Sequence, residues 1–327
     1  MTGVKVPKYR DLPIKQGAPK GSAWGVFDKD SKRDVYGTLN FITPEAILAA
    51  KEEIRAGESV VLNLPLHLPY HSSNIGRCEF SHKFLADAFE QKCVDDEITI
   101  NTQATSQWDG LLHFANQDLS VYYNGVPYEA ASIHRSDKSL GIQSLSQRGG
   151  IVARGILVDF VRYAARKGIE YNPLGPYRIT LDQIQEILQE EKVETRQGDI
   201  LVVRCGLSKY IRASTPEDPT PFTAGGNQTH VGIDPTPELI EWLWDSNFAA
   251  VAGDSLACEA VPAFDGSFGR LHTACLPGWG MPLGELLDLE ALAALAEKHQ
   301  RWTFFMTVSP LNIDGGAATL SNTIAIM

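Results

Sequence analysis

The sequence predicts an α/β protein in which helices pack against a mixed β-sheet within one large domain. Three observations predict this class. Short apolar runs recur along the chain, as expected for buried strands. Amphipathic helical patterns lie among them, but strands and helices alternate only in the middle third, which favours a mixed sheet over a doubly wound one. The composition, with 43% hydrophobic and 21% charged residues, is ordinary for a globular protein.

The domain organisation follows from length and local composition. A chain of 327 residues can form two domains or one large α/β domain, and no interdomain linker is visible. We therefore expect one domain over residues 23–327. Residues 1–22 are polar and contain Pro and Gly, which predicts an N-terminal arm that is disordered or wraps a neighbouring subunit. Residues 214–229 are rich in Pro, Gly and Thr, which is typical of a lid or an interface loop.

The first elements are marked by capping residues and apolar runs. Thr43 and Pro44 are typical of a helix start, and Gly57 lies beyond the end of this helix. The apolar run at residues 60–64 predicts a strand. Residues 97–105 predict a second strand, because apolar and polar residues alternate at its start.

The middle of the chain contains the clearest strand–helix alternation. Residues 156–161 and 200–205 are apolar and predict buried strands. Between them, Thr180 and Gln183 have the spacing of a capping box, in which the two side chains bond the first backbone N–H groups of a helix.

The last third predicts two helices and three strands. Thr236 is placed to cap one helix and Asp288 begins the other. The remaining apolar segments predict strands at residues 249–253, 303–308 and 318–326.

The charge balance limits the partners. Lys and Arg number 29 against 40 Asp and Glu, so the formal net charge is −11. No basic cluster stands out, and binding to nucleic acid or to an anionic membrane surface needs one. We therefore expect a small-molecule substrate and neither a nucleic-acid nor a membrane partner.

The cysteines and the N-terminal segment indicate the compartment. The five cysteines are odd in number and form no CxxC pair, which disfavours a disulfide framework and a thiolate zinc cage. The N-terminal residues lack the apolar core of a signal peptide, and no apolar run approaches the ~20 residues of a membrane helix. We expect a cytoplasmic protein.

The first candidate site follows the predicted strand at residues 97–105. Gln107 and Asp109 are two residues apart and share one side of an extended segment. His113 comes four residues later, where a turn would return it towards Asp109. An amide oxygen, a carboxylate and an imidazole suit a divalent cation. The alternative is an Asp that caps a turn and a structural His.

Two later segments supply further candidates. Glu259 follows an apolar strand, the usual position of site residues in α/β proteins, and would accept a proton if it faced the same cavity. His272 lies among small and apolar residues, where an imidazole serves as a base or a ligand. Glu285 has apolar neighbours, and buried carboxylates are rare unless paired or metal-bound. The alternatives are a solvated Glu259, a core His272 and a Glu285 at a helix start.

Together these segments resemble the putative cyclase family, which includes bacterial kynurenine formamidase and isatin hydrolase. The family pattern HxGTHxDxPxHF is written here as QATSQWDGLLHF at residues 103–114. Residues 22–47 resemble the longer branch of the family. Further matching segments follow in the family's order: GGIVARGILVDF (149–160), GDILVVRCG (198–206), AGDSLACE (252–259) and LHTACLPGWGMPLGELLDLEAL (271–292).

The resemblance implies a metal-dependent hydrolase with a swivelling β/β/α-type fold, and a homo-oligomer, either a dimer or a tetramer. The family's motif positions fall, in order, on Gln103, Gln107, Asp109, His113, His272 and Glu285. Two motif histidines are thus glutamine, which disfavours a two-zinc centre.

The implied metal ligands are therefore Gln107, Asp109, His113 and Glu285. Such an oxygen-rich set favours one ion of manganese, zinc or magnesium over a pair. The alternative is that this chain has lost the ion altogether.

The function expected from this set is hydrolysis of a cyclic or aryl amide, or of a lactone, by metal-activated water. His272 would act as general acid and base, His113 as ligand or proton shuttle, and Glu259 as proton acceptor. Trp108 and Phe114 would form an aromatic wall for a planar substrate. Two alternatives stay open: a non-hydrolytic cyclase, dehydratase or isomerase, and a metal-free small-molecule binding protein.

Overall fold

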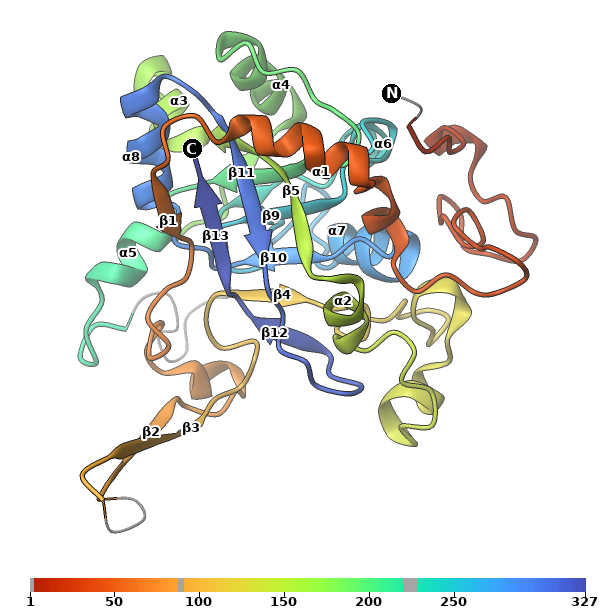
Figure 1. Cartoon of the computed structure of the whole chain (residues 1–327). Coiled ribbons are helices and arrows are strands. Elements are labelled where there is room, and N and C mark those ends of the chain that lie inside the picture. The colour runs from red at the N-terminus through yellow and green to blue at the C-terminus, as the bar shows by residue number, and fades with distance from the viewer. Residues whose placement is uncertain (1–2, 88–90, 220–228) are drawn as a thin grey trace.

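A nine-stranded mixed sheet forms the centre of the computed structural model, which describes residues 3–87, 91–219 and 229–327 (Figure 1). Its strands lie in the order β1-β13-β11-β5-β7-β9-β10-β4-β12. Their bounds are β1 Ser59–Val61, β4 Gln107–Asp109, β5 Ile151–Asp159, β7 Ile200–Arg204, β9 Ala250–Gly253, β10 Leu283–Glu285, β11 Thr303–Val308, β12 Ala318–Leu320 and β13 Thr323–Ile326.

The middle of the sheet is parallel and its flanks are antiparallel. Strands β5, β7, β9 and β10 pair in parallel, whereas β11 pairs antiparallel with β5 and β4 pairs antiparallel with both β10 and β12. The central strands consist mainly of apolar residues that are buried on both faces, as parallel strands usually are. The predicted mixed-sheet α/β class is thus confirmed.

Helices and loops cover both faces of this sheet. Alternate residues of β7 enter different cores, Leu201 and Val203 one and Ile200 and Val202 the other. The first core includes residues of α3 Phe160–Lys167, α4 Leu181–Glu190, α5 Leu207–Ala213, α6 Pro237–Asp245 and α7 Arg270–Thr273. The second is covered by α1 Pro44–Ala50, α2 Gln143–Arg148 and α8 Glu290–His299.

Smaller elements complete the fold. Two short sheets lie outside the main one, β2 Ser81–Ala86 with β3 Val94–Thr99 and β6 Arg178–Ile179 with β8 Gly232–Ile233. The β2–β3 hairpin projects from the body of the molecule (Figure 1). The remaining single turns are η1 Tyr9–Asp11, η2 Gly37–Phe41, η3 Lys51–Glu53, η4 Ser72–Ile75, η6 Tyr123–Gly125, η7 Glu129–Ile133 and η8 Ala274–Trp279.

The predicted helix starts are confirmed at three threonines. The hydroxyl oxygens of Thr43, Thr180 and Thr236 each accept a backbone N–H at the start of α1, α4 and α6. Thr180 and Gln183 form the complete reciprocal capping box. The last helix begins at Glu290, two residues after the predicted start at Asp288.

Two strand predictions were wrong in extent. The strand predicted at residues 97–105 ends at Thr99, in the hairpin and not in the main sheet. A turn replaces its second half, because Asn101 accepts the backbone N–H of Gln103 through its side chain and that of Ala104 through its carbonyl. The segment predicted as one strand at residues 318–326 is divided into β12 and β13, which pair with different neighbours.

The described part of the N-terminal arm packs against its own chain. The backbone N–H of Tyr9 donates to Asp245 of α6 at 2.8 Å, and the indole of Trp244 donates to the carbonyl of Pro7 at 2.9 Å. Residues 220–228 of the predicted lid or interface loop lie outside the described residues. No helix in the described ranges is both long enough and apolar enough to cross a membrane.

Candidate metal centre

The centre is built on the short strand β4 and its neighbour β10. Gln107 and Asp109 lie on one face of β4, and both are fully buried. The register places Glu285 of β10 directly opposite Gln107. A turn in which the N–H of His113 donates to the carbonyl of Gly110 returns His113 towards Asp109. The predicted convergence of these side chains is therefore present in the structure.

A second wall of the centre comes from α7. His272 lies on this helix and is only 3% exposed. Its Nδ1 lies 2.6 Å from Oε1 of Glu259, and the backbone N–H groups of Leu271 and His272 donate to the same carboxylate at 3.2 Å. Glu259 thus fixes the orientation of the imidazole and leaves Nε2 facing the centre.

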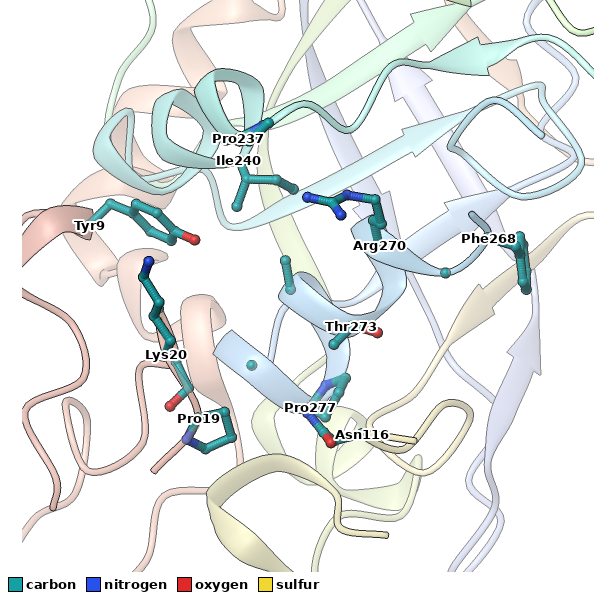
Figure 2. A pocket seen from close by; sticks show the side chains of 15 residues that line it. Tyr9, Pro19, Lys20, Asn116, Pro237, Ile240, Phe268, Arg270, Thr273 and Pro277 are labelled. Atoms are coloured by element: carbon teal, nitrogen blue, oxygen red, sulfur yellow. The ribbon is translucent and has the colours of Figure 1, made fainter. Parts of the chain in front are cut away.

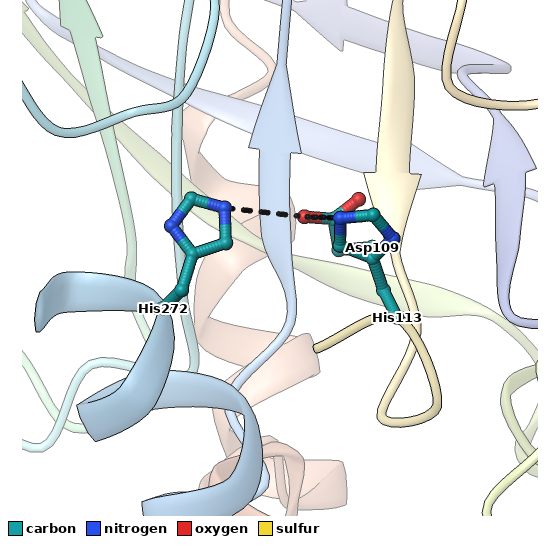
Figure 3. Close-up of side chains that lie close together, drawn as sticks. All are labelled: Asp109, His113 and His272. Atoms are coloured by element: carbon teal, nitrogen blue, oxygen red, sulfur yellow. Dashed lines mark ion pairs between the residues drawn. The ribbon is translucent and has the colours of Figure 1, made fainter. Parts of the chain in front are cut away.

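Three donor atoms converge in this space. The Nε2 atoms of His113 and His272 each lie 3.9 Å from Oδ2 of Asp109 (Figure 3). One ligand atom from each residue lies within 4.8 Å of the other two. Ligands that share a divalent ion at about 2.1 Å lie about 3–4 Å apart, so a small shift of these side chains would suffice.

Buried oxygens without partners provide the test of whether an ion fits. Oε1 of Gln107 and Oδ2 of Asp109 are buried and accept no hydrogen bond from any described residue. Oε1 of Glu285 is also buried, and its polar neighbour is Nε2 of His272 at 3.3 Å. A buried carboxylate oxygen without a partner is costly, and a cation is the ligand that satisfies several such oxygens at once. The residues present therefore fit a divalent ion.

The glutamines tie the acidic groups together. Nε2 of Gln107 donates to Oε1 of Gln103 and to Oε2 of Glu285, both at 2.7 Å. Nε2 of Gln103 donates in turn to Oδ1 of Asp109 at 2.5 Å. These hydrogen bonds hold one oxygen of each carboxylate against an amide, so that the second oxygen of each faces the centre. Gln103 was not among the predicted ligands, although its spacing from Gln107 and its motif position indicate it.

The pKa values of the buried acidic and imidazole groups depend on one another's charges. Although burial lowers the pKa of His272, its hydrogen bonds to Glu259 and Glu285 outweigh burial and raise the pKa to about 10. Burial and the negative charge of Asp109 raise the pKa of Glu285. The acidic cluster therefore favours a positive charge in its midst, whether carried by an imidazolium or by an ion.

The two predicted aromatic contacts have different positions. Phe114 packs beside the centre, with its ring 5.2 Å from that of His272. Trp108 lies on the opposite face of β4, is fully buried in the second core and donates to Thr323 at 2.9 Å. The structure brings Phe114 but not Trp108 to the centre.

Two cavities share Phe268 as a lining residue. The larger, of about 450 Å³, lies between α7 and the N-terminal arm and is lined by Tyr9, Lys20 and Arg270 but not by His272 (Figure 2). The other, of about 320 Å³, is lined by Arg77, His230 and Phe268. Burial lowers the pKa of Arg77, and the negative charges of Glu285 and Asp109 act against this effect. The smaller cavity is therefore the one beside the centre.

Comparison with known proteins identifies the family. A family model described as putative cyclase matches residues 64–260. The chain belongs to the putative cyclase family. This family assignment confirms the resemblance drawn from the motif segments. Among proteins of curated function, none matches this sequence.

Solved structures agree with this assignment. The structure of a novel cyclase is similar over 94% of this chain and 99% of its own, with 29% identity and a TM-score of 0.79. An isatin hydrolase bound to the product analogue thioisatinate covers 88% and 99%, with 14% identity and a TM-score of 0.60. Isatin hydrolase A from Ralstonia solanacearum covers 87% and 98%, with 16% identity and a TM-score of 0.57. The last two likenesses show the shared cyclase fold.

Proposed function

We propose that this chain is a metal-dependent hydrolase of a cyclic or aryl amide or of a lactone. The observation that carries the proposal is the convergence of buried oxygens from Gln107, Asp109 and Glu285 beside His113, of which those of Gln107 and Asp109 accept no hydrogen bond from any described residue. Hydrolase chemistry is also what the names of the isatin hydrolases describe for those proteins of this fold.

Asp109 and His113 would hold the ion, with further oxygens from Gln107 and Glu285. When bound, a divalent ion polarises a carbonyl and lowers the pKa of water towards ~7. The amide of Gln103 holds the second oxygen of Asp109, and that of Gln107 holds the second oxygen of Glu285. Each carboxylate is therefore presented to the ion through one fixed oxygen.

His272 would transfer the proton. Its Nδ1 is held by Glu259 and its Nε2 lies 3.3 Å from Oε1 of Glu285, so the proton it moves is the one on Nε2. A divalent ion beside Glu285 would offset the negative charge that raises the pKa of His272, so that Nε2 would be free to accept a proton from water. The carboxylate at Nδ1 stabilises the imidazolium that then forms. The same proton then passes to the leaving nitrogen or oxygen, a contribution of about 10²–10⁴ in rate.

Activity on a substrate panel tests this function. Formanilides, isatin-like lactams and lactones are offered to the purified protein with and without chelator, and product masses are measured. We expect chelator-sensitive turnover with gain of one water. Asp109→Asn should abolish it, whereas Asp182→Asn, on the exposed side of α4, should not. Absence of turnover with every divalent metal added would contradict the proposal.

The glutamine pair favours a second candidate, a non-hydrolytic cyclase, dehydratase or isomerase. The amide N–H groups of Gln103 and Gln107 donate to neighbouring side-chain oxygens. Neither glutamine can accept a proton from water as histidine does, so the site has fewer groups that activate water. An unchanged product mass would indicate cyclisation or isomerisation, and loss of one water would indicate dehydration. Specific binding of these compounds without ion or turnover would instead indicate a binding protein.

A split between metal affinity and turnover tests the role of His272. We expect His272→Gln to keep the ion and to lose about 10²–10⁴ in kcat. Isothermal titration with Mn²⁺, together with kcat for the best substrate of the panel, measures both quantities. Loss of the ion in this variant would assign His272 to the ligands instead.

A further inference from the structure

The cavity of about 320 Å³ beside the centre combines one cation with apolar walls. Arg77 and His230 supply its polar side, and Leu256, Val261 and Phe268 supply most of the rest. The ring of Phe268 lies 5.6 Å from that of His272 and 6.4 Å from that of Phe114. The aromatic wall of this cavity therefore lies against the imidazole that faces the metal centre.

Arg77 is a half-buried cation without an ion-pair partner. Its guanidinium donates to the backbone carbonyl of Gln103, and no described carboxylate lies within 4.0 Å of it. Removing a guanidinium from water without a counter-ion is costly, and Arg presents a planar fork that matches a carboxylate. The side chain is therefore placed to receive an anion from outside the protein.

The charges of the metal centre do not satisfy Arg77. Asp109 and Glu285 attract it, yet neither lies within ion-pair distance. An ion held between these carboxylates would neutralise them further. The positive charge of the Arg77 guanidinium then stays unbalanced on the side that faces the cavity.

His230 gives a second, independent observation. It is 5% exposed, and its backbone is fixed to Val261 by two hydrogen bonds of 3.1 Å. Its Nε2 is buried and has no hydrogen-bond partner among the described residues, although the residue lines the cavity. A buried ring nitrogen without a partner is rare in proteins, and it indicates a ligand at this wall.

We propose that Arg77 and His230 bind a carboxylate of the substrate, while its aromatic body lies against Leu256, Val261 and Phe268. This inference rests on the proposed function, since it names the substrate class of the same site: an aryl amide or lactone whose ring carries a carboxylate. Arg77 would pair with both carboxylate oxygens, and His230 would donate one hydrogen bond. The apolar walls would cover the ring.

Binding of two matched ligands tests this proposal without any turnover. Anthranilate carries a carboxylate where 2-aminobenzamide carries a neutral amide, and isothermal titration of the metal-loaded protein gives both Kd values. We expect anthranilate to bind at least 10-fold tighter. Arg77→Gln should remove this preference and Arg77→Lys should keep part of it, because Lys retains the charge but not the fork. Arg55→Gln, an exposed arginine, is the matched control.

Either of two results would overturn the proposal. Equal affinities for the two ligands would show that no carboxylate is recognised. A preference that survives in a folded Arg77→Gln variant would show that the ion, and not Arg77, binds the carboxylate. Thermal melting verifies that each variant is folded.

The experiment separates this proposal from hydrolysis itself. With N-formylanthranilate and formanilide as substrates, Arg77→Gln should raise KM at least 10-fold for the first only. If neither is hydrolysed but the binding preference depends on Arg77, hydrolysis fails and the carboxylate site stands. If formanilide is hydrolysed and the preference is absent, the carboxylate site fails and hydrolysis stands.

Discussion

Glu259 shows how a single residue determines the state of the site. Its carboxylate accepts two backbone N–H groups from the start of α7 as well as the contact with Nδ1 of His272. The carboxylate is thereby held rigid, and it holds the imidazole in turn. The sequence led us to expect Glu259 as a proton acceptor facing the cavity, whereas its position behind His272 supports the role of orienting that ring.

Replacing Glu259 should therefore weaken the site without unfolding it. We expect Glu259→Gln to lower kcat 10- to 100-fold, because the amide keeps the shape but does not stabilise the imidazolium. Steady-state kinetics on the best substrate measure this loss. Glu241→Gln, on the exposed side of α6, serves as control. Unchanged kcat in Glu259→Gln would contradict this role.

His230 should make stability depend on pH in a defined window. Burial lowers the pKa of His230 to about 4, whereas unfolded histidine titrates near ~6.5. Between these values the unfolded chain binds a proton that the folded chain does not. The free energy of unfolding should therefore fall as pH falls from about 6.5 to about 4, by about 3 kcal/mol from this group.

Denaturant unfolding across this window, in wild type and His230→Gln, measures the effect. We expect the variant to lose part of the acid-side decline, since glutamine does not titrate. His134→Gln replaces an exposed histidine and should keep the decline. The same pH dependence in His230→Gln as in wild type would show that burial of His230 does not set it.

At the scale of elements, local signals were predictive where a few neighbouring residues decide the structure. Thr180 and Gln183 bond each other's backbone, so the start of α4 is readable from four residues. Strand β4 is different. It has only three residues, and its place between β10 and β12 depends on partners about 175 and 210 residues away in sequence. The sequence pattern identified Gln107 and Asp109 but not the strand that carries them.

The cap of α4 gives a stability prediction that is independent of the site. Thr180→Ala should lower the free energy of unfolding by about 1 kcal/mol, because the N–H of Gln183 loses its acceptor. Thr180→Ser keeps the hydroxyl and should lose much less. Denaturant unfolding at neutral pH measures both variants, and equal stability of Thr180→Ala and wild type would contradict the role of the cap.

The residues of the cavity mark the limit of what the sequence predicts at the site. Spacing placed Gln107, Asp109 and His113 together, apolar neighbours singled out His272 and Glu285, and the family resemblance joined the two sets. Neither indicated Arg77 or His230, because a single Arg or His in a loop has no spacing signal. Tertiary structure places them at the cavity: Arg77 follows the turn after η4, and a β-bridge to Val261 holds His230.

At the scale of the whole molecule, the sheet gathers residues that are far apart in the chain. The parallel strands β9 and β10 end at the same side, so Glu285 and the segment that leads to Glu259 meet there. Helix α7 then adds His272 from the covering layer. The same arrangement places the two proposed sites, the ion between Asp109 and His113 and the carboxylate at Arg77, on the two sides of the rings of His272 and Phe268.

The location of a bound ion tests the central claim most directly. A crystal of the protein grown with Mn²⁺ should show one anomalous-scattering peak in contact with Oδ2 of Asp109 and Nε2 of His113, at about 2.0–2.2 Å from each. Asp109→Asn crystals grown in the same way should lack it. A peak held elsewhere in the protein, or no peak at Asp109 in the wild type, would contradict the account.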